Sequence, residues 1–272
     1  MTISCIIRWI EHQGSTRSSA LMRIGVVALL WTEYAAEQRL WKLADSLDLA
    51  LALLFFVASA GMLLGFFTRV SASLTALCTV LFYYYLGVYR SNQEYVHHHN
   101  YLLMMGAVLI ACTPCGRSFS VDRYLALRRA RRQGKSLPLE TGSLWALRLI
   151  AMQLAVMYFW AAYDKSFAGF INGDRLEMIF LHKYHGSDYP DSALFPITMN
   201  FLAPMTLALE YALAFLVWHP KLKPALLVCG VVFHSIMYFT LPVETFSLTV
   251  CLLYIGFLDP AWVHELSSTA EY

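Results

Sequence analysis

The amino-acid sequence predicts an all-α integral membrane protein, a bundle of about eight transmembrane helices with no large extramembrane domain. Apolar residues make up 58% of the 272-residue chain and charged residues only 14%, whereas soluble domains have roughly 45–50% apolar and about 25% charged residues. The mean hydropathy is +0.54. The apolar runs are continuous rather than alternating, which favours helices over a transmembrane β-barrel.

The individual spans follow from run length, because a bilayer core of about 30 Å requires roughly 20 mostly apolar residues per helix. Polar connections between the runs are short, and the chain has no internal repeat. Residues 1–272 are therefore expected to form a single transmembrane domain. The predicted spans are 19–36, 47–67, 72–89, 95–113, 144–163, 196–218, 222–241 and 245–258.

Loop charge predicts the orientation, because Lys and Arg favour the cytoplasmic side of a membrane. The densest basic stretch lies between the fourth and fifth predicted spans. Alternate crossings then place both termini in the cytoplasm and bring the span ends that carry His99 and Lys165 to the outer side. We expect a protein of the bacterial inner membrane. The basic stretch comprises Arg117, Arg123, Arg128, Arg129, Arg131, Arg132 and Lys135.

Charge and cysteine spacing argue against two other classes of function. The net charge of +2 is too small to favour nucleic-acid binding, so a membrane lipid and a lipophilic small molecule are the expected partners. Cys112 and Cys115 have the spacing of a redox motif, but no βαβ pattern surrounds them. We interpret them as small residues that pack at a helix end.

Ionisable side chains inside the predicted spans are the candidate functional residues, because a charge in lipid is costly and usually faces a bundle interior or a water-filled cavity. His97, His98 and His99 enter the fourth span about 100° apart, so one of them is expected to face the interior. Lys165 lies at the outer end of the fifth span, on the helix face that carries Tyr158.

Two further candidates lie deeper in apolar runs. His234 shares a helix face with Tyr238, and Glu210 is expected to be protonated or paired. Simple structural roles are the alternatives: histidines at the interface, a lysine that snorkels to water, and hydrogen bonds between helices. The predicted catalytic residues are Lys165, His99, His234 and Glu210, with Tyr101, Tyr158, Trp160, Asp164 and Tyr238 as substrate-binding residues. No metal site is assigned.

Several motifs, taken in order, resemble the HTTM (horizontally transferred transmembrane) family, whose best-known members are the vitamin K-dependent γ-glutamyl carboxylases. The resemblance covers most of the chain. It rests on 98–102 (HHNYL), on Ser120 and Asp122 in a Ser-x-Asp element, on 158–173 (with Tyr158, Ala161, Lys165 and Gly173), and on Phe233 and His234 followed by Phe246.

The resemblance implies roles for two of the candidates. The lysine that matches Lys165 is the carboxylase base that activates vitamin K hydroquinone toward oxygen, and the histidine that matches His99 assists the carboxylation step. A reduced quinone with O2 and CO2 would then be required. The animal carboxylases grip their protein substrate with a large lumenal domain. We expect no such domain after the last predicted span, and therefore no carboxylation of polypeptides.

The leading interpretation is therefore a membrane enzyme that performs acid/base chemistry on a lipophilic quinol or prenyl substrate in a chamber that faces the outer side. A lysine acts as a base where apolar surroundings favour its neutral amine. An isoprenoid (terpene) cyclase on the same scaffold is an alternative, with Glu210 or Asp164 as proton donor. A non-enzymatic accessory or maturation protein that binds a lipid or an exported peptide is another. A metal enzyme using His97, His99, His182, His185 and His234 is a fourth possibility.

Overall fold

The computed structural model describes residues 13–37, 45–183, 194–241, 243 and 245–269. The chain groups into two compact units. Unit 1 comprises Met1–Ala151 and Leu252–Tyr272, and unit 2 comprises Met152–Cys251. The described residues are mainly helical, which confirms the all-α class. Each unit is described by itself below, and the expected single domain stays a prediction.

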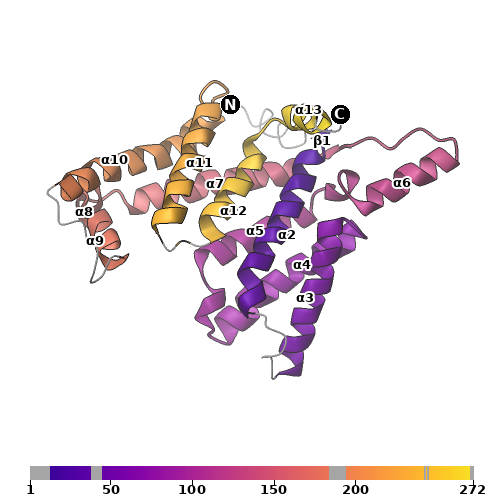
Figure 1. Ribbon diagram of the computed structural model, residues 1–272, viewed down its shortest axis with the longest axis horizontal. Coiled ribbons are helices and arrows are strands. Elements are labelled where there is room, and N and C mark those ends of the chain that lie inside the picture. Colours follow the sequence, from indigo (N-terminus) through magenta and orange to yellow (C-terminus); the bar gives the residue numbers. More distant parts are fainter. Residues whose placement is uncertain (1–12, 38–44, 184–193, 242, 244, 270–272) are drawn as a thin grey trace. The chain divides into compact units, whose positions relative to one another are not determined.

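Unit 1 is built around helices from the first half of the chain (Figure 1). Helix α3 packs against α2 and α4, and α5 packs against α2 and α4. A small antiparallel sheet, which the sequence did not predict, pairs Gln13 with Ser143. The elements are β1 (Gln13–Ser15), α2 (Arg17–Glu37), α3 (Ser46–Leu64), α4 (Thr68–Leu81), η2 (Phe82–Tyr89), η3 (Gln93–Tyr95), α5 (His98–Ala111), η4 (Cys115–Arg117), α6 (Val121–Arg132), β2 (Thr141–Ser143), η6 (Tyr254–Phe257) and α13 (Pro260–Thr269).

A buried aromatic cluster forms the core between α2, α3 and η2. The rings of Tyr34, Phe55 and Phe82 have centroids 5.1–5.8 Å apart, and Tyr95 stacks on Tyr34 at 6.1 Å. All four side chains are buried. Aromatic pairs at such distances add to the stability that apolar burial provides, so this cluster holds the start of α5 close to α2.

The turn between α3 and α4 is shaped by Gly65 and by Asp122 from α6. Gly65 has a φ of 65°, which favours glycine, and a Cβ there would overlap with Ser120. The Asp122 carboxylate accepts hydrogen bonds from the backbone N–H groups of Phe67 (3.1 Å) and Thr68 (2.7 Å) and from the Thr68 hydroxyl (2.7 Å). Asp122 thus caps α4 in the way that an N-cap side chain does.

Two arginines of α2 bind other parts of unit 1. Arg23 is fully buried and donates to the carbonyl oxygens of Cys115 (3.0 Å) and Phe119 (2.6 Å). Arg17 forms an ion pair with Glu140 at 2.8 Å and donates to the Ser267 hydroxyl of α13 at 2.9 Å. A buried guanidinium is tolerated where carbonyls and carboxylates satisfy it, so these contacts attach η4, the residues just before α6 and β2, and α13 to α2.

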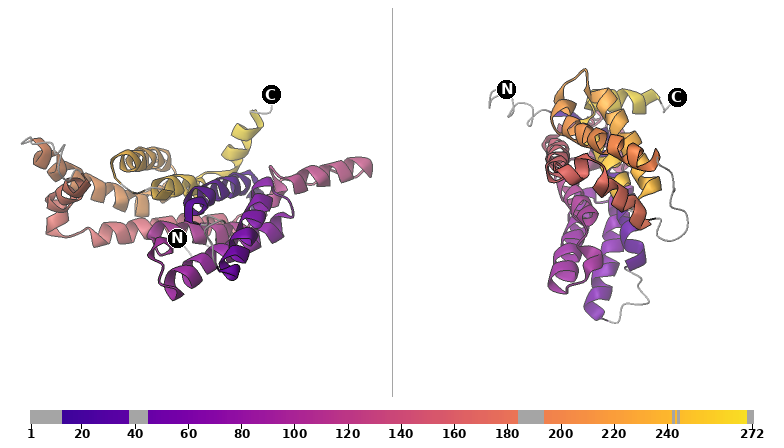
Figure 2. Two further views of the ribbon diagram at one scale, coloured as in Figure 1. Left: turned by 60° about the horizontal axis from the view of Figure 1, so that its bottom comes forward. Right: turned by 90° about the vertical axis from the view of Figure 1, so that its left-hand side faces the viewer.

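Unit 2 contains the C-terminal part of α7, the helices from α8 to α11 and most of α12 (Figure 2). Helix α10 packs against α8, α9 and α11. Gly173, with a φ of 84°, allows the start of α9 to approach α10, because a Cβ there would lie 2.6 Å from the Asn200 nitrogen. The helices are α7 (Trp145–Asp164), α8 (Ala168–Ile171), α9 (Asp174–Lys183), α10 (Leu194–Phe215), η5 (Leu216–Trp218), α11 (Lys223–Thr240) and α12 (Thr245–Leu253).

Five described helices are long and apolar enough to cross a membrane: Ser46–Leu64, Thr68–Tyr89, Trp145–Asp164, Leu194–Trp218 and Lys223–Thr240. A sixth is added if Thr245–Phe257 and Pro260–Ser268, which are bent by 103°, count as one span. The predicted number of eight is therefore confirmed only in part. Helix α2 is less apolar because it carries Arg23 and Glu33, and the 14 residues of α5 extend only about 21 Å.

Candidate functional site

Two helices of unit 2 bring Lys165 and Glu210 together. Lys165 directly follows α7, and Glu210 lies within α10. The Lys165 Nζ lies 2.5 Å from Glu210 Oε1, with the lysine side chain 33% exposed and the glutamate side chain 6% exposed. Next to the lysine, Ala162 is fully buried, and a small residue at this position lets a neighbouring helix come close. The expectation that Glu210 is paired is confirmed.

Only one oxygen of the Glu210 carboxylate is satisfied by this contact. Its second oxygen, Oε2, is buried and has no hydrogen-bond partner among the described residues. A buried carboxylate oxygen without a partner is energetically unfavourable. The pair therefore combines a partly exposed amine with a buried carboxylate whose Oε2 can accept one more hydrogen bond.

A second polar pair lies two helical turns earlier on α7. The Tyr158 hydroxyl is 2.7 Å from His234 Nε2 of α11, and the two residues are 2% and 1% exposed. Tyr158 and Lys165 are seven residues apart, or about 10 Å along a helix. Tyr158 on α7 and Lys165 just after it thus each contact a predicted catalytic residue on another helix.

Aromatic rings surround His234. The ring centroids of Phe233, Phe246 and Tyr158 lie 5.3, 5.8 and 6.1 Å from the imidazole centroid. Beside Lys165, the Ser166 hydroxyl donates to the Ala162 carbonyl oxygen at 2.8 Å. Its oxygen therefore accepts the contact from the Tyr211 hydroxyl at 2.9 Å. The surroundings of His234 are therefore aromatic, whereas hydroxyl groups lie beside Lys165.

Unit 1 holds the third pair, at the start of α5. His99 Nε2 lies 2.9 Å from Glu33 Oε1 of α2, and both side chains are mostly buried. His97 stacks on His99 with centroids 5.2 Å apart, and His98 is exposed. The expectation that one histidine of the three faces inward is confirmed. Sequence reasoning missed Glu33, although an acidic residue inside the apolar run 19–36 was the signal that could have revealed it.

The remaining predicted residues lie elsewhere. Tyr101 and Tyr238 are 41% and 42% exposed, Trp160 is 58% exposed, and Asp164 is also exposed. Among the described residues, no hydrogen bond joins any of these four to the three pairs. Their substrate-binding roles stay predictions. Because His99 belongs to unit 1 and Lys165 to unit 2, their approach to one cavity also stays a prediction.

Neither a metal cluster nor a dithiol centre emerges from the described part of the chain. No three His, Cys, Asp or Glu side chains there are placed to hold a metal ion, and His185 lies outside the described residues. Cys112 is exposed and Cys115 is buried, and burial raises the pKa of the Cys115 thiol above its ordinary value. A raised thiol pKa disfavours the reactive thiolate, in agreement with a packing role for Cys115, whereas the exposed Cys112 does not show the predicted packing.

Comparison with known proteins adds one finding to this geometry. No curated protein and no solved structure matches the chain. The family model for the HTTM domain matches residues 33–262, which include the three pairs and most of the chain. The domain is related to the membrane part of vitamin K-dependent carboxylase. The chain is therefore an integral membrane protein that belongs to the HTTM domain family.

Proposed function

We propose that this protein is a membrane enzyme that performs acid/base chemistry on a lipophilic quinol or prenyl substrate, with Lys165 as the base. The observation that carries the proposal is the Lys165–Glu210 contact, in which a 33% exposed lysine side chain meets a carboxylate that is only 6% exposed. The amine can reach a substrate while the acid stays within the protein. Carboxylase-like chemistry would use a reduced quinone together with O2 and CO2.

The hydrogen bond from Lys165 to Glu210 gives the ammonium proton of Lys165 a route to the carboxylate. When the ammonium passes its proton to Glu210, the charged pair becomes a neutral amine and a neutral acid. Surroundings of low dielectric constant reduce the cost of this change, because they penalise the two separate charges. The neutral amine can then remove a proton from a quinol hydroxyl, and Glu210 stores the first proton. A general base of this kind accelerates a reaction by about 10²–10⁴-fold.

Cyclisation of an isoprenoid chain is the second candidate, and the rings beside His234 favour it. Phe233, Phe246 and Tyr158 surround the imidazole with centroids at 5.3–6.1 Å. Aromatic faces stabilise a nearby cation, which a cyclising prenyl chain would carry. In this reaction Glu210, rather than Lys165, would supply the initiating proton. Asp164 is exposed and is less suited to that role.

Turnover by purified protein in lipid nanodiscs tests both candidates. One set of reactions contains a reduced quinone with O2 and is assayed for oxidised quinone, and the other contains a linear prenyl alcohol or diphosphate and is assayed for a cyclised product. We expect Lys165→Ala and Lys165→Arg to lose about 99% or more of the product formed in the quinone reaction, because a guanidinium does not release its proton.

Lys223→Ala is the matched control, because Lys223 starts α11 and its side chain forms no hydrogen bond or ion pair among the described residues. Full activity of Lys165→Arg would contradict the lysine base. Prenyl cyclisation that depends on Glu210 and survives Lys165→Arg would favour the second candidate. Failure of the wild-type protein to turn over either substrate, with a lipid or exported peptide co-purifying, would favour an accessory function.

A further inference from the structure

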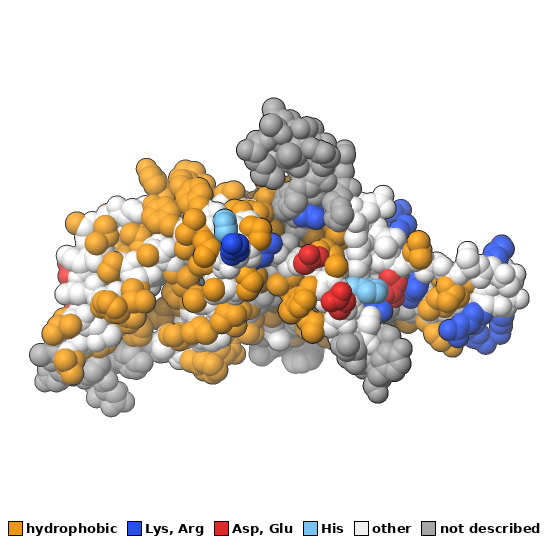
Figure 3. Space-filling model, turned by 90° about the horizontal axis from the view of Figure 1, so that it is seen from above, with side chains coloured by type: hydrophobic (Ala, Val, Ile, Leu, Met, Phe, Trp, Pro, Cys, Tyr) orange, Lys and Arg blue, Asp and Glu red, His pale blue; other side chains and the backbone are white. Residues whose placement is uncertain are grey.

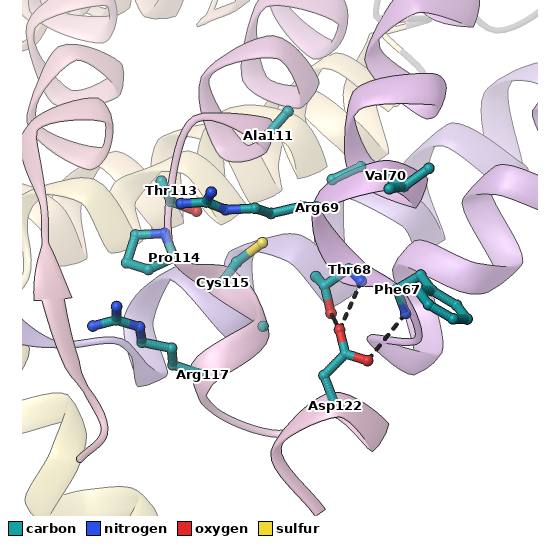
Figure 4. Close-up of a pocket in the computed structure, with 12 residues that line it drawn as sticks. Phe67, Thr68, Arg69, Val70, Ala111, Thr113, Pro114, Cys115, Arg117 and Asp122 are labelled. Carbon is teal, nitrogen blue, oxygen red and sulfur yellow. Dashed lines mark hydrogen bonds between the residues drawn. The ribbon is translucent and has the colours of Figure 1, made fainter. Parts of the chain in front are cut away.

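A pocket in unit 1 is separate from the residues of the proposed function. It has a volume of about 570 Å³ and lies between the start of α4 and the segment that joins α5 to α6 (Figure 4). Its walls are partly apolar and partly charged. Phe67, Val70, Ala72, Ala111 and Pro114 are apolar lining residues, and Arg69, Arg117 and Asp122 are charged.

The two arginines make one side of the pocket positive. Their guanidinium groups lie to either side of Pro114 in Figure 4. Arg117 donates one hydrogen bond to the Thr141 carbonyl oxygen at 2.5 Å. Within the described ranges, neither Arg69 nor Arg117 forms an ion pair with a carboxylate. Both guanidinium groups therefore retain donors for an external anion.

The one carboxylate in the pocket is already occupied. Asp122 lies on the opposite wall, where its oxygens accept hydrogen bonds from the Phe67 and Thr68 nitrogens and from the Thr68 hydroxyl (Figure 4). Capping the positive end of α4 offsets much of the carboxylate charge locally. The arginine side thus remains the part of the pocket that attracts an anion.

An exposed apolar face leads away from the same pocket. Val70 and Leu77 are 59% and 50% exposed, and a spacing of seven residues places them on one face of α4. Helix α4 with η2, Thr68–Tyr89, is one of the five helices that could span a membrane. In a bilayer this face contacts acyl chains, so the positive side of the pocket and a lipid-facing surface adjoin.

We propose that this pocket binds the phosphate group of an anionic phospholipid, with Arg69 and Arg117 holding the phosphate and the acyl chains lying along Val70 and Leu77. The planar guanidinium group forms paired hydrogen bonds with phosphate oxygens. A soluble phosphate ester could use the same arginines, but it would gain nothing from the apolar face. The pocket therefore selects a phosphate that carries hydrocarbon chains.

Native mass spectrometry of the purified protein tests the proposal by counting bound lipids after titration with phosphatidylglycerol or phosphatidylcholine. We expect retention of phosphatidylglycerol over phosphatidylcholine, and a loss of about tenfold in phosphatidylglycerol affinity in Arg69→Gln/Arg117→Gln. The control is Arg128→Gln/Arg132→Gln on α6, which removes the same charge outside the pocket. Equal losses in the two double variants would overturn the proposal.

Two further measurements distinguish a bound phospholipid from a bound soluble phosphate, and paired hydrogen bonds from simple charge attraction. Glycerol 3-phosphate, added alone, should neither displace the lipid nor raise the melting temperature, and displacement would show that the pocket takes soluble phosphate instead. Arg69→Lys keeps the charge but loses the paired hydrogen bonds, so its affinity should fall between wild type and Arg69→Gln. Wild-type affinity in Arg69→Lys would contradict a phosphate held by paired hydrogen bonds. The substituted arginine side chains are exposed, so the variants and the wild-type protein should have the same melting temperature without lipid.

Discussion

At Glu210, burial destabilises the charged carboxylate, and pairing with Lys165 stabilises it. Moving a carboxylate out of water is costly, and the Lys165 ammonium 2.5 Å away offsets that cost. The same lysine is the base of the proposed reaction. A variant that removes Lys165 therefore loses both the proposed base and the partner of a buried acid. Loss of activity alone does not separate these effects, so stability must be measured beside it.

The first prediction follows from this double role. Lys165→Met should lower the free energy of unfolding by about 1–3 kcal/mol, because it leaves the Glu210 carboxylate buried and unpaired. Adding Glu210→Leu should recover most of that loss, since no charge then remains. Thermal melting in matched detergent measures both variants, with Lys223→Met as the control. Stability of Lys165→Met equal to wild type would contradict the pairing.

At the scale of elements, a charged network fixes the start of α3 to the end of η2. Arg90 lies 2.8 Å from Asp45 and 2.9 Å from Asp48, and its guanidinium carbon is 5.0 Å from the Tyr85 ring centroid. The hydrogen bond from Arg90, with a second from the Leu47 N–H group, lowers the pKa of the Asp45 carboxyl. The network connects two predicted spans at their ends, outside the apolar core.

The second prediction is the pH dependence of this network. A carboxyl whose pKa is lower in the folded than in the unfolded state stabilises the fold above the unfolded pKa, about 3.9. That contribution is lost as the pH falls through the lowered folded pKa. Asp45→Asn should therefore melt below wild type at neutral pH and match it in strong acid. Melting curves across this range measure the effect.

Asp164→Asn is the control for this series, because Asp164 is exposed and has no partner among the described residues. Its melting temperature should follow wild type at every pH. Added salt should narrow the difference between Asp45→Asn and wild type at neutral pH, since salt screens exposed charges. A difference that persists in strong acid would contradict the assigned cause.

At the scale of the whole molecule, basic residues gather on one element. Helix α6 carries Arg129, Arg131 and Arg132 in its last turn. Figures 1 and 2 show it extending away from the other helices of unit 1, and Figure 3 shows Lys and Arg side chains gathered over its end. Such a basic element is typical of the cytoplasmic side of a membrane protein.

The third prediction is this orientation. Cysteines introduced beside Arg131 should react with an impermeant maleimide only from the cytoplasmic side, and cysteines beside Ser187 only from the outside. Ser187 lies outside the described residues. Among the described residues, Cys112 and Cys229 are the exposed native cysteines, and both are replaced by serine in the starting variant. Labelling of both positions from one side would contradict the orientation and the shared outer side of His99 and Lys165.

Particular residues show how much of the candidate site could be predicted. Lys165, Glu210 and His234 were recognisable because an ionisable residue in an apolar run is costly and needs a partner. The identity of each partner could not be predicted, because helical periodicity gives the face of a side chain and not the helix opposite. Glu33 in the apolar run 19–36 carried the same signal and was missed, and its pairing with His99 depends on how α2 and α5 pack.

The sequence by itself determined that this is a helical membrane protein of the HTTM family, because hydropathy and motif order are local properties of the chain. The tertiary structure decided which polar groups meet: Lys165 with Glu210, Tyr158 with His234 and His99 with Glu33. It also decided that Asp122, part of a recognised motif, caps α4. The physical reason is that each contact joins residues distant in sequence, and only the packing of the helices brings them within hydrogen-bond distance.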